Sequence, residues 1–197
     1  MEKQFTVKEL IQSDCQRYGG SNGFGRKVRT RMVYPSFQYT CEYRKVHGYL
    51  KRGKKGLGYY YHRYRLLKLS IKYGYQVNPA AEIGPGFYIG HRGTVIINGN
   101  AKLGANVNIA TGVTIGQENR GKREGCPTIG NEVWIGTNSI IVGKVTIGDN
   151  VLIAPGTYVN FDVPSDSIVV GSPAKIIPNK EATKGYIQRP YEMMDRE

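Results

Sequence analysis

His91 is the side chain in this sequence whose type and position best suit acid–base chemistry. It lies in the stretch IGHRGTVIINGN, residues 89–100, where an otherwise regular spacing of aliphatic residues slips by two. A neutral imidazole has an unperturbed pKa of about 6.5, so it can take a proton from a hydroxyl group at neutral pH. We therefore predict that His91 is a general base, with an incidental structural side chain as the alternative. We interpret the other two histidines, His47 and His62, as packing or surface residues.

A second irregular stretch, QENRGKREGCP at residues 117–127, adds eight residues to the same spacing. Its cations, among them Arg120 and Arg123, suit a flap that lies near phosphate groups, whereas the alternative is a solvated surface loop. Cys126 in this stretch is one of three cysteines, which share no CxxC spacing and are expected to be reduced thiols. We do not expect Cys126 to be a nucleophile, because direct attack by a hydroxyl needs no covalent intermediate.

The regular spacing predicts the elements that position these residues. Aliphatic residues, usually followed by Gly or a small polar residue, recur six apart, and a period of six is neither helical nor that of a single strand. It fits a coil of three short strands in which one side chain per hexad points inward, so that stacked coils bury a column of Ile and Val. The series is Val77, Ile83, Ile89, Ile97, Leu103, Ile109, Ile115, Ile129, Ile135, Ile141, Ile147, Ile153 and Val159.

We therefore predict a mainly β fold, a parallel β-helix over residues 77–178 with a C-terminal tail over residues 179–197. The alternative, a β-sandwich, needs alternation with a period of two, which this stretch lacks. A corner lengthened by two residues would project His91 away from the stack. A zinc site of three histidines is not expected, because the β-helix contains only His91.

The N-terminal region, residues 1–76, differs chemically from the rest. It holds 17 Lys and Arg against 4 Asp and Glu, and 11 of the 15 tyrosines, whereas the remaining residues carry 11 of each charge. We predict a small α-helical cap of two or three helices that covers the open end of the solenoid. The expected elements are helices over residues 5–18, 35–53 and 57–74 and a loop over residues 19–25.

Three interpretations of this basic, Tyr-rich region remain open. It could grip nucleic acid, with stacking from Tyr59, Tyr60 and Tyr61, or lie on an anionic membrane surface. We favour the third, a solvated face, and do not expect a nucleic-acid partner. The sequence has no apolar run long enough to span a membrane, and its N-terminus is too charged for a signal peptide. The expected location is the cytoplasm, with the inner face of the membrane as the place where anionic lipid would be met.

Five stretches, in chain order, carry a resemblance to a known family. They are YPSFQYTCEYRKVHGYLKRG, QVNPAAEIGPGFYIGHRGTVI, VTIGQ, CPTIGNEVWIG and VVGSPAKII. Together, over roughly residues 12–178, they resemble the serine O-acetyltransferase family of hexapeptide-repeat acyltransferases. The resemblance implies a left-handed parallel β-helix, a homotrimer and acetyl-CoA as co-substrate, and the single histidine of the β-helix gives no reason to expect a metal. It also implies that His91 is the base that activates a hydroxyl to attack the thioester.

The sequence departs from the family pattern where the family binds serine. The catalytic Asp that partners the base is replaced by Gln76, and the Asp of the Asp-His pair by Gly90. The Arg-His pair before the second Pro is replaced by Gly125 and Cys126, and the helical-domain Asp falls near Asn22. Because these groups are neutral, we predict a carbohydrate hydroxyl, in a surface or exopolysaccharide precursor, as the acceptor. The alternatives are a serine O-acetyltransferase of cysteine synthesis and a basic binding module.

The resemblance also implies binding positions. The acceptor would contact Asn22, Gln76 and Cys126, and coenzyme A would contact Gly116 and Thr137. By their charge, Arg92 is a further candidate for the acceptor, and Arg123 and Lys175 are candidates for the phosphates of the coenzyme. Lys175 has a surface lysine as its alternative. The pantetheine arm would lie in the groove between adjacent β-helices, so we expect the active sites between subunits. Glu82 is the acid nearest to His91 in sequence, but the sequence does not place its side chain.

Overall fold

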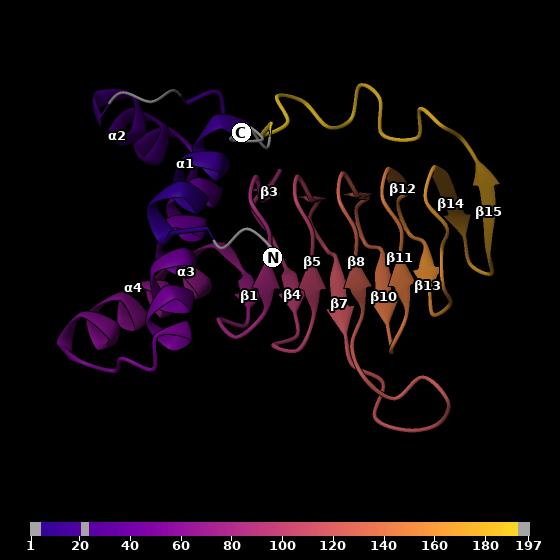
Figure 1. The fold of residues 1–197 in the computed structure, drawn as a ribbon, viewed down its shortest axis with the longest axis horizontal. Coiled ribbons are helices and arrows are strands. Elements are labelled where there is room, and N and C mark those ends of the chain that lie inside the picture. Colours follow the sequence, from indigo (N-terminus) through magenta and orange to yellow (C-terminus); the bar gives the residue numbers. More distant parts are fainter. Residues whose placement is uncertain (1–4, 21–23, 193–197) are drawn as a thin grey trace.

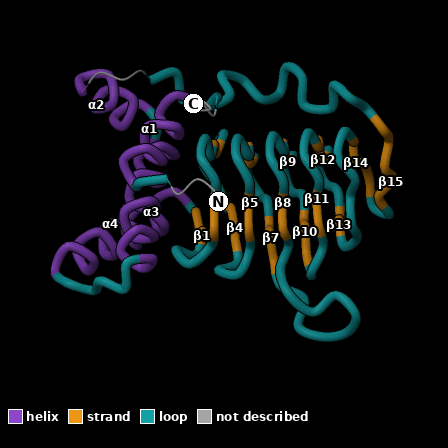
Figure 2. The backbone as a smooth tube through the Cα atoms, viewed as in Figure 1, coloured by secondary structure: helices purple, strands orange, loops and turns teal. Residues whose placement is uncertain are grey.

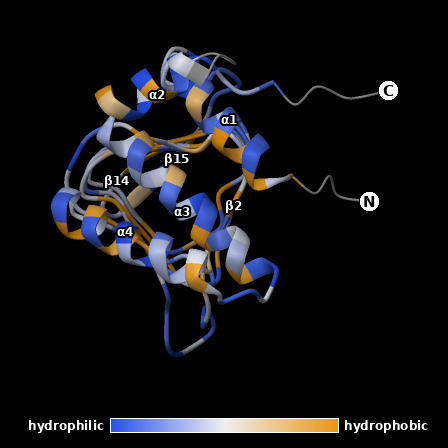
Figure 3. Cartoon of the chain, turned by 90° about the vertical axis from the view of Figure 1, so that its left-hand side faces the viewer, coloured by the Kyte–Doolittle hydropathy of each residue, from blue (hydrophilic) through white to orange (hydrophobic). Residues whose placement is uncertain are grey.

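Helices at one end and a β-solenoid at the other make up the chain (Figure 1). The computed structural model describes residues 5–20 and 24–192. The helices lie across the first coil of the solenoid, and viewed from that end they cover it (Figure 3). The predicted arrangement of a helical cap on a stack of β-coils is thus confirmed.

The cap contains four helices in the described residues, rather than the two or three predicted. The helix α1 (Val7–Arg17) begins with a capping box between Thr6 and Glu9, and α3 (Pro35–Lys51) begins with proline, whose fixed φ suits the first turn. The helix α4 (Leu57–Tyr73) ends at Gly74, which adopts the left-handed conformation at φ 83°. The unpredicted helix is α2 (Phe24–Val33), and it begins inside the stretch that was predicted to be a loop.

The solenoid is a left-handed parallel β-helix of about five turns, with three sheets as its sides. Sheet A contains β1 (Tyr75–Val77), β4 (Val95–Ile97), β7 (Thr114–Gly116), β10 (Ile140–Val142) and β13 (Tyr158–Val159). Sheet B contains β2 (Glu82–Ile83), β5 (Lys102–Leu103), β8 (Thr128–Ile129) and β11 (Thr146–Ile147). Sheet C contains β3 (Tyr88–Ile89), β6 (Asn108–Ile109), β9 (Trp134–Ile135), β12 (Val151–Ile153), β14 (Ser167–Gly171) and β15 (Ala174–Pro178). Only the last pair, β14 with β15, is antiparallel among these described strands.

The aliphatic residues of the six-residue series fill the centre of the solenoid. Each lies in a different strand from β1 to β13, and every one is buried, from Ile89 at 0% exposed to Ile83 at 6%. Parallel pairing keeps equivalent positions in register, so that Ile97 lies beside Ile115 and Ile115 beside Ile141. The six-residue period therefore predicts the solenoid directly, because each strand has one inward-facing position that must be apolar.

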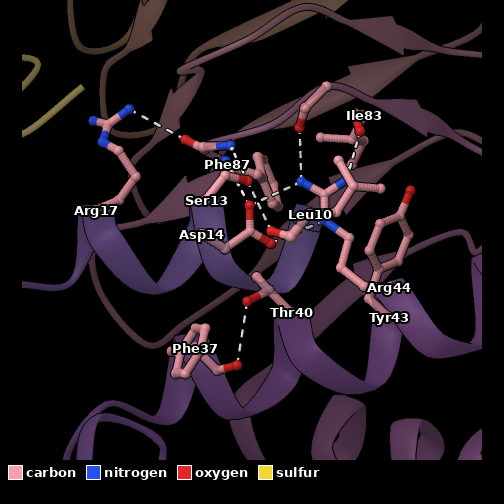
Figure 4. Close-up of polar contacts among 12 residues, drawn as sticks. Leu10, Ser13, Asp14, Arg17, Phe37, Thr40, Tyr43, Arg44, Ile83 and Phe87 are labelled. Atoms are coloured by element: carbon pink, nitrogen blue, oxygen red, sulfur yellow. Dashed lines mark hydrogen bonds and ion pairs between the residues drawn. The ribbon is translucent and has the colours of Figure 1, made fainter. Parts of the chain in front are cut away.

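A buried ion pair joins the cap to the solenoid (Figure 4). The Nε and Nη2 atoms of Arg44 on α3 each donate to a carboxylate oxygen of Asp14 on α1 at 2.9 Å, and both side chains are fully buried. The same guanidinium donates to the backbone carbonyls of Ile83 and Gly84, and the Asp14 carboxylate accepts the N–H of Phe87. Each charge is therefore matched by several hydrogen bonds, which is the condition for burying an ion pair at tolerable cost.

The C-terminal segment, residues 179–192, folds back from the far end of the solenoid towards the cap (Figure 1). Near its start, Asn150 Nδ2 donates to the carbonyl of Lys180 at 2.8 Å. Near its end, Arg17 Nε on α1 donates to the carbonyl of Gln188 at 3.1 Å. The segment thus links the last coils to the cap along the outside of sheet C, which the sequence did not predict.

The outer face of α4 carries exposed aromatic and aliphatic side chains. Tyr60, Tyr61 and Tyr64 are more than half exposed, and so is Ile71. Arg65 lies over the ring of Tyr61. None of the described helices has the length and apolar composition required to cross a bilayer.

Candidate active site

His91 lies at the corner where the chain passes from sheet C to sheet A, between β3 and β4. This corner, which we call the C–A corner, is longer in the first coil than in the following coils, as the slip in the sequence indicates. Gly93 within it has φ 133°, and a Cβ there would lie 2.2 Å from Thr111 Oγ1, so only glycine fits. The Gly93 N–H donates to the carbonyl of Tyr73, and the phenol of Tyr75 donates to the carbonyl of His91. The corner is therefore held at the backbone while His91 is exposed.

The imidazole of His91 has no hydrogen-bond or ion-pair partner among the described residues. Glu82, the nearest acid in sequence, is exposed on β2 in sheet B, a different side of the solenoid. It therefore does not orient His91 within one chain. Among the described residues, therefore, no carboxylate orients the imidazole of His91.

A cavity of about 310 Å³ opens beside His91. Its floor is the outer face of sheet C, where Tyr88, Asn108 and Trp134 lie in register on three neighbouring strands. Thr137 and His91 border the floor at the C–A corner. The volume is at the small end of ligand-binding cavities, which run from about 300 to 1,000 Å³.

The other walls of the cavity come from the cap and the C-terminal segment. Tyr18 and Tyr34 close the cap side, with ring centroids 5.5 Å apart. Tyr186 and Arg189 cover the cavity from the C-terminal segment, where the Tyr186 ring lies 4.9 Å from that of Trp134. Aromatic side chains therefore surround the space next to His91.

The predicted acceptor residues are not gathered at this cavity. Arg92 is exposed next to His91, but it is not part of the cavity lining. Gln76 is exposed on the outer face of β1, and Cys126 lies in the 117–127 loop at the corner between sheets A and B. Asn22 lies outside the described residues. Burial raises the pKa of Cys126, so its thiol stays protonated at neutral pH, which agrees with a residue that is not a nucleophile.

One of the four predicted coenzyme residues lies beside His91. Thr137 lines the same cavity. Gly116 ends β7 at the corner between sheets A and B, and Arg123 lies in the loop that follows. Lys175 is exposed on β15 at the far end of the solenoid. Within one chain these positions do not form a single site.

The 117–127 loop projects out of the stack below β7 (Figure 2). Its two sides pair as a short antiparallel bridge, in which the N–H groups of Glu118 and Gly125 each donate to the other's carbonyl at 3.0 Å. The carbonyl of Arg123 accepts the N–H of Lys144, which ties the loop to the next coil. The loop thus projects from the solenoid and is held in place by these hydrogen bonds. A flap that covers a neighbouring molecule needs this geometry.

The other two histidines of the described chain contact groups within the cap and the first coil. His47 Nδ1 lies 2.8 Å from the carbonyl of Pro79, and His62 Nδ1 lies 2.7 Å from Glu42 Oε2. Both agree with the predicted packing or surface roles. No cluster of three or more His, Cys, Asp or Glu side chains suited to a metal occurs in the described part of the chain. A second hollow, of about 410 Å³ and lined by residues of α1 including Gln12, contains none of the predicted site residues.

Sequence reasoning missed the aromatic and cationic lining of the cavity. Tyr18, Trp134 and Tyr186 come from three separate regions of the chain, and Arg17 and Arg189 are 172 positions apart. The six-residue series could not reveal them, because it reports only inward-facing positions. The only available signal was the stretch GYIQRPY, residues 185–191, whose two tyrosines and one arginine are unusual for a solvated tail.

Comparisons with known proteins agree with this architecture. Residues 126–160 match the family model described as bacterial transferase hexapeptide (six repeats). A serine acetyltransferase of Helicobacter pylori is 33% identical over 90% of this chain and 97% of its own. The structure of the Neisseria gonorrhoeae serine acetyltransferase in complex with serine superimposes with a TM-score of 0.68 at 31% identity, covering 86% of this chain and 68% of that one. That of the Brucella abortus enzyme in complex with coenzyme A gives 0.72 at 26% identity, covering 87% and 68%.

These comparisons correct one expectation. The polysaccharide-type branch and its carbohydrate acceptor find no support, because the relatives described above are named serine acetyltransferases. The placement at the inner face of a membrane is likewise without support. The predicted family, the predicted fold and the acyl-transfer chemistry agree with the relatives.

Proposed function

Because the chain belongs to the serine acetyltransferase family of hexapeptide-repeat transferases, we propose that this acetyltransferase moves the acetyl group of acetyl-CoA to the hydroxyl of serine. The observation that carries the proposal is the position of His91, exposed at a lengthened corner and bordering a cavity walled by the cap, sheet C and the C-terminal segment. A base must reach both a bound hydroxyl and the incoming thioester, and such a position allows this.

His91 is the proposed general base. Its neutral imidazole takes the proton of the acceptor hydroxyl as the oxygen attacks the thioester carbonyl. The tetrahedral intermediate then collapses, the carbon–sulfur bond breaks, and the thiolate of coenzyme A receives the proton back from the imidazolium. Backbone N–H groups at the corners of the coils are the available donors for the oxyanion. The raised pKa of Cys126 supports direct transfer over an acetyl-cysteine intermediate.

Coenzyme A is proposed to lie along the stack of coils, with its thioester near His91. From β3 to β15, five strand spacings of about 4.8 Å give about 24 Å, a length suited to an extended pantetheine arm. Thr137 lies near the thioester end of this path, and Lys175 lies at the far end, where phosphates would bind. Gly116 and Arg123 belong to the other edge of sheet A, so in this proposal they are supplied by an adjacent subunit.

We also propose a homotrimer with its active sites between subunits. The 117–127 loop and His91 stand at opposite edges of sheet A, about 20 Å apart if a six-residue side is extended. The imidazole of His91 also lacks a carboxylate partner among the described residues. An adjacent β-helix would bring a second loop to the first His91 and would form the groove for the coenzyme.

Release of thiol from acetyl-CoA, measured against a panel of serine, sugars and glycans, tests the acceptor. Serine saturating in the millimolar range or below, with the carbohydrates inactive, is the expected result. The His91→Ala variant serves as the control for uncatalysed transfer. Turnover of a sugar with serine inactive would contradict the proposal.

One feature of the sequence has to be reconciled with serine as the acceptor. Gln76, Gly90, Gly125 and Cys126 are uncharged at the positions where the family binds the charged groups of serine. Uncharged groups can hydrogen-bond a sugar but do not offset the desolvation of a zwitterion. Serine therefore needs charged or aromatic partners elsewhere in the structure.

A further inference from the structure

Two arginines line the cavity beside His91, and neither pairs with a carboxylate of the described residues. They are Arg17 at the end of α1 and Arg189 in the C-terminal segment. All ion pairs between described residues involve other side chains. A site that binds an anion is built in this way, because the positive charge is left for the ligand to neutralise.

Arg17 is almost completely buried, at 3% exposed, and the groups that accept its hydrogen bonds are all neutral. Its guanidinium donates to the carbonyls of Gly86 and Gln188 and to the side-chain oxygens of Asn106 and Asn108. These contacts use four of the five N–H groups of the guanidinium. Burial lowers the pKa of Arg17 to about 10, although the nearby charges of Asp14 and Glu132 raise it, so the group remains charged at neutral pH without a carboxylate in direct contact.

Arg189 is exposed and reaches the same space from the opposite wall. Its backbone has φ 50°, a left-handed conformation that is uncommon for a residue with a side chain. The guanidinium passes close to Gly19, where an added Cβ would lie 3.0 Å from its Nη1 atom. Strained backbone of this kind persists where the surrounding contacts require it, and the Arg189 side chain lines the cavity.

We propose that Arg189, assisted by the buried charge of Arg17, binds the carboxylate of the acceptor in the cavity beside His91. This inference rests on the proposed function. Arg189 would supply the cation that is missing at position 125, where this chain has glycine. A planar guanidinium matches a carboxylate with two parallel hydrogen bonds. The ring of Tyr34, which lines the cavity and is 41% exposed, suits the ammonium group of the same molecule through cation–π attraction.

The distinguishing ligand pair is serine and serinamide, which share the hydroxyl and the ammonium group but differ in the carboxylate. Trp134 is the single tryptophan of the chain and lines the cavity, so its fluorescence reports binding without turnover. Native protein, Arg189→Gln and the matched control Arg63→Gln, on the exposed part of α4, are titrated with each ligand. Turnover with acetyl-CoA is measured in parallel.

The expected result is that Arg189→Gln weakens serine binding by about 10-fold or more, the usual effect of losing a hydrogen bond between charged groups. Serinamide binding and the KM for acetyl-CoA should stay unchanged in this variant, and Arg63→Gln should match the native protein. Arg189 is preferred to Arg17 for the test because Arg17 also holds the C-terminal segment in place.

The two proposals can fail separately. Equal effects of Arg189→Gln on serine and serinamide, or no effect on either, would overturn the carboxylate site even if serine is acetylated. Serine binding that depends on Arg189, without any acetylation of serine, would support the carboxylate site and overturn the proposed function. An absence of both binding and turnover with serine would overturn both.

Discussion

The phenol of Tyr75 donates a hydrogen bond to the backbone carbonyl of His91, with 3.1 Å between the two oxygens. The phenol oxygen also lies 2.8 Å from Ser36 Oγ on α3, and Tyr75 is completely buried. Because the phenol proton points to His91, Ser36 is the donor in the second contact. The first strand and the cap therefore fix together the corner that carries the proposed base.

Tyr75→Phe removes this hydroxyl and nothing else. We expect kcat to fall by about tenfold and the KM for acetyl-CoA to stay unchanged. The reason is that a small displacement of the base lowers the rate of proton transfer more than it weakens substrate binding. The free energy of unfolding should fall by about 1 kcal/mol for the lost hydrogen bonds. Tyr73→Phe, which removes the hydroxyl that donates to Gln38 at 3.0 Å, is the matched control. Equal losses of kcat in both variants would argue against a positioning role.

His91→Ala should lower kcat by about 10²–10⁴-fold, the usual contribution of a general base, while coenzyme A still binds. Calorimetric titration with coenzyme A measures the binding, and steady-state thiol release measures the rate. Cys126→Ser should retain most of the activity, since burial raises the pKa of that thiol. Loss of turnover in Cys126→Ser, together with an acetylated Cys126 trapped in the native protein, would reverse the assignment.

Sedimentation velocity should show a trimer, or a multiple of a trimer, as the active species. The physical reason is that His91 and the 117–127 loop occupy opposite edges of sheet A, so one chain does not complete the site. Deletion of the loop tip, residues 119–122, which leaves the bond between Arg123 and Lys144 in place, should lower activity without changing the stacking of the coils. A monomer with full activity would exclude a site shared between subunits.

Acid should weaken the cap through Glu42, whose side chain is fully buried. Burial alone would raise the pKa of Glu42. The opposite effect of its partners is larger, so the pKa lies below the ordinary value of 4.5; these partners are His62, Lys45, Arg65 and Arg31. A carboxyl group whose pKa is lowered by folding stabilises the folded state at pH values above its unfolded-state pKa. This stabilisation is lost as the pH falls through the folded-state pKa.

Glu42→Gln is the test of this acid dependence. The variant should be less stable than the native protein at pH 7, by about 2 kcal/mol, because a buried hydrogen bond between charged groups is lost. The difference should shrink as the pH falls below about 4.5. Urea unfolding midpoints at pH 7, 5, 4 and 3 measure it. A difference that is independent of pH would show that the carboxylate charge does not stabilise the cap.

The sequence predicted the solenoid closely, because a single inward residue per strand decides each side of the coil. Ile97 and Ile115 illustrate this, since they are adjacent in the structure and mark equivalent positions in the six-residue series. The lengthened corner at His91 was predicted for the same reason: a slip in a strict period must leave the stack. The helix α2 was missed because GGSNGFG, at residues 19–25, is loop-like in composition, yet the helix begins within it.

The cavity was beyond prediction from the sequence. Its walls come from α1, sheet C and residues 179–192, and no local pattern records that Arg17 meets Gln188 across 171 positions. The charge of Arg17 was also hidden, because a basic region with 17 cations gives no sign of which one is buried. Matching the motifs to the family showed where this chain lacks the expected charged side chains, as at Gln76. It did not show which other residues line the site with charge.

The return of residues 179–192 to the cap changes how the stack can lose order. In a linear array of coils, the last coil can fray alone, because each repeat contacts only its neighbours. Here the segment that follows β15 also covers the cavity, so local unfolding at the far end of the solenoid would loosen the contacts that cover the cavity beside His91. Local opening at one end and accessibility of the cavity at the other are thus coupled, and amide hydrogen exchange would detect them as one cooperative unit.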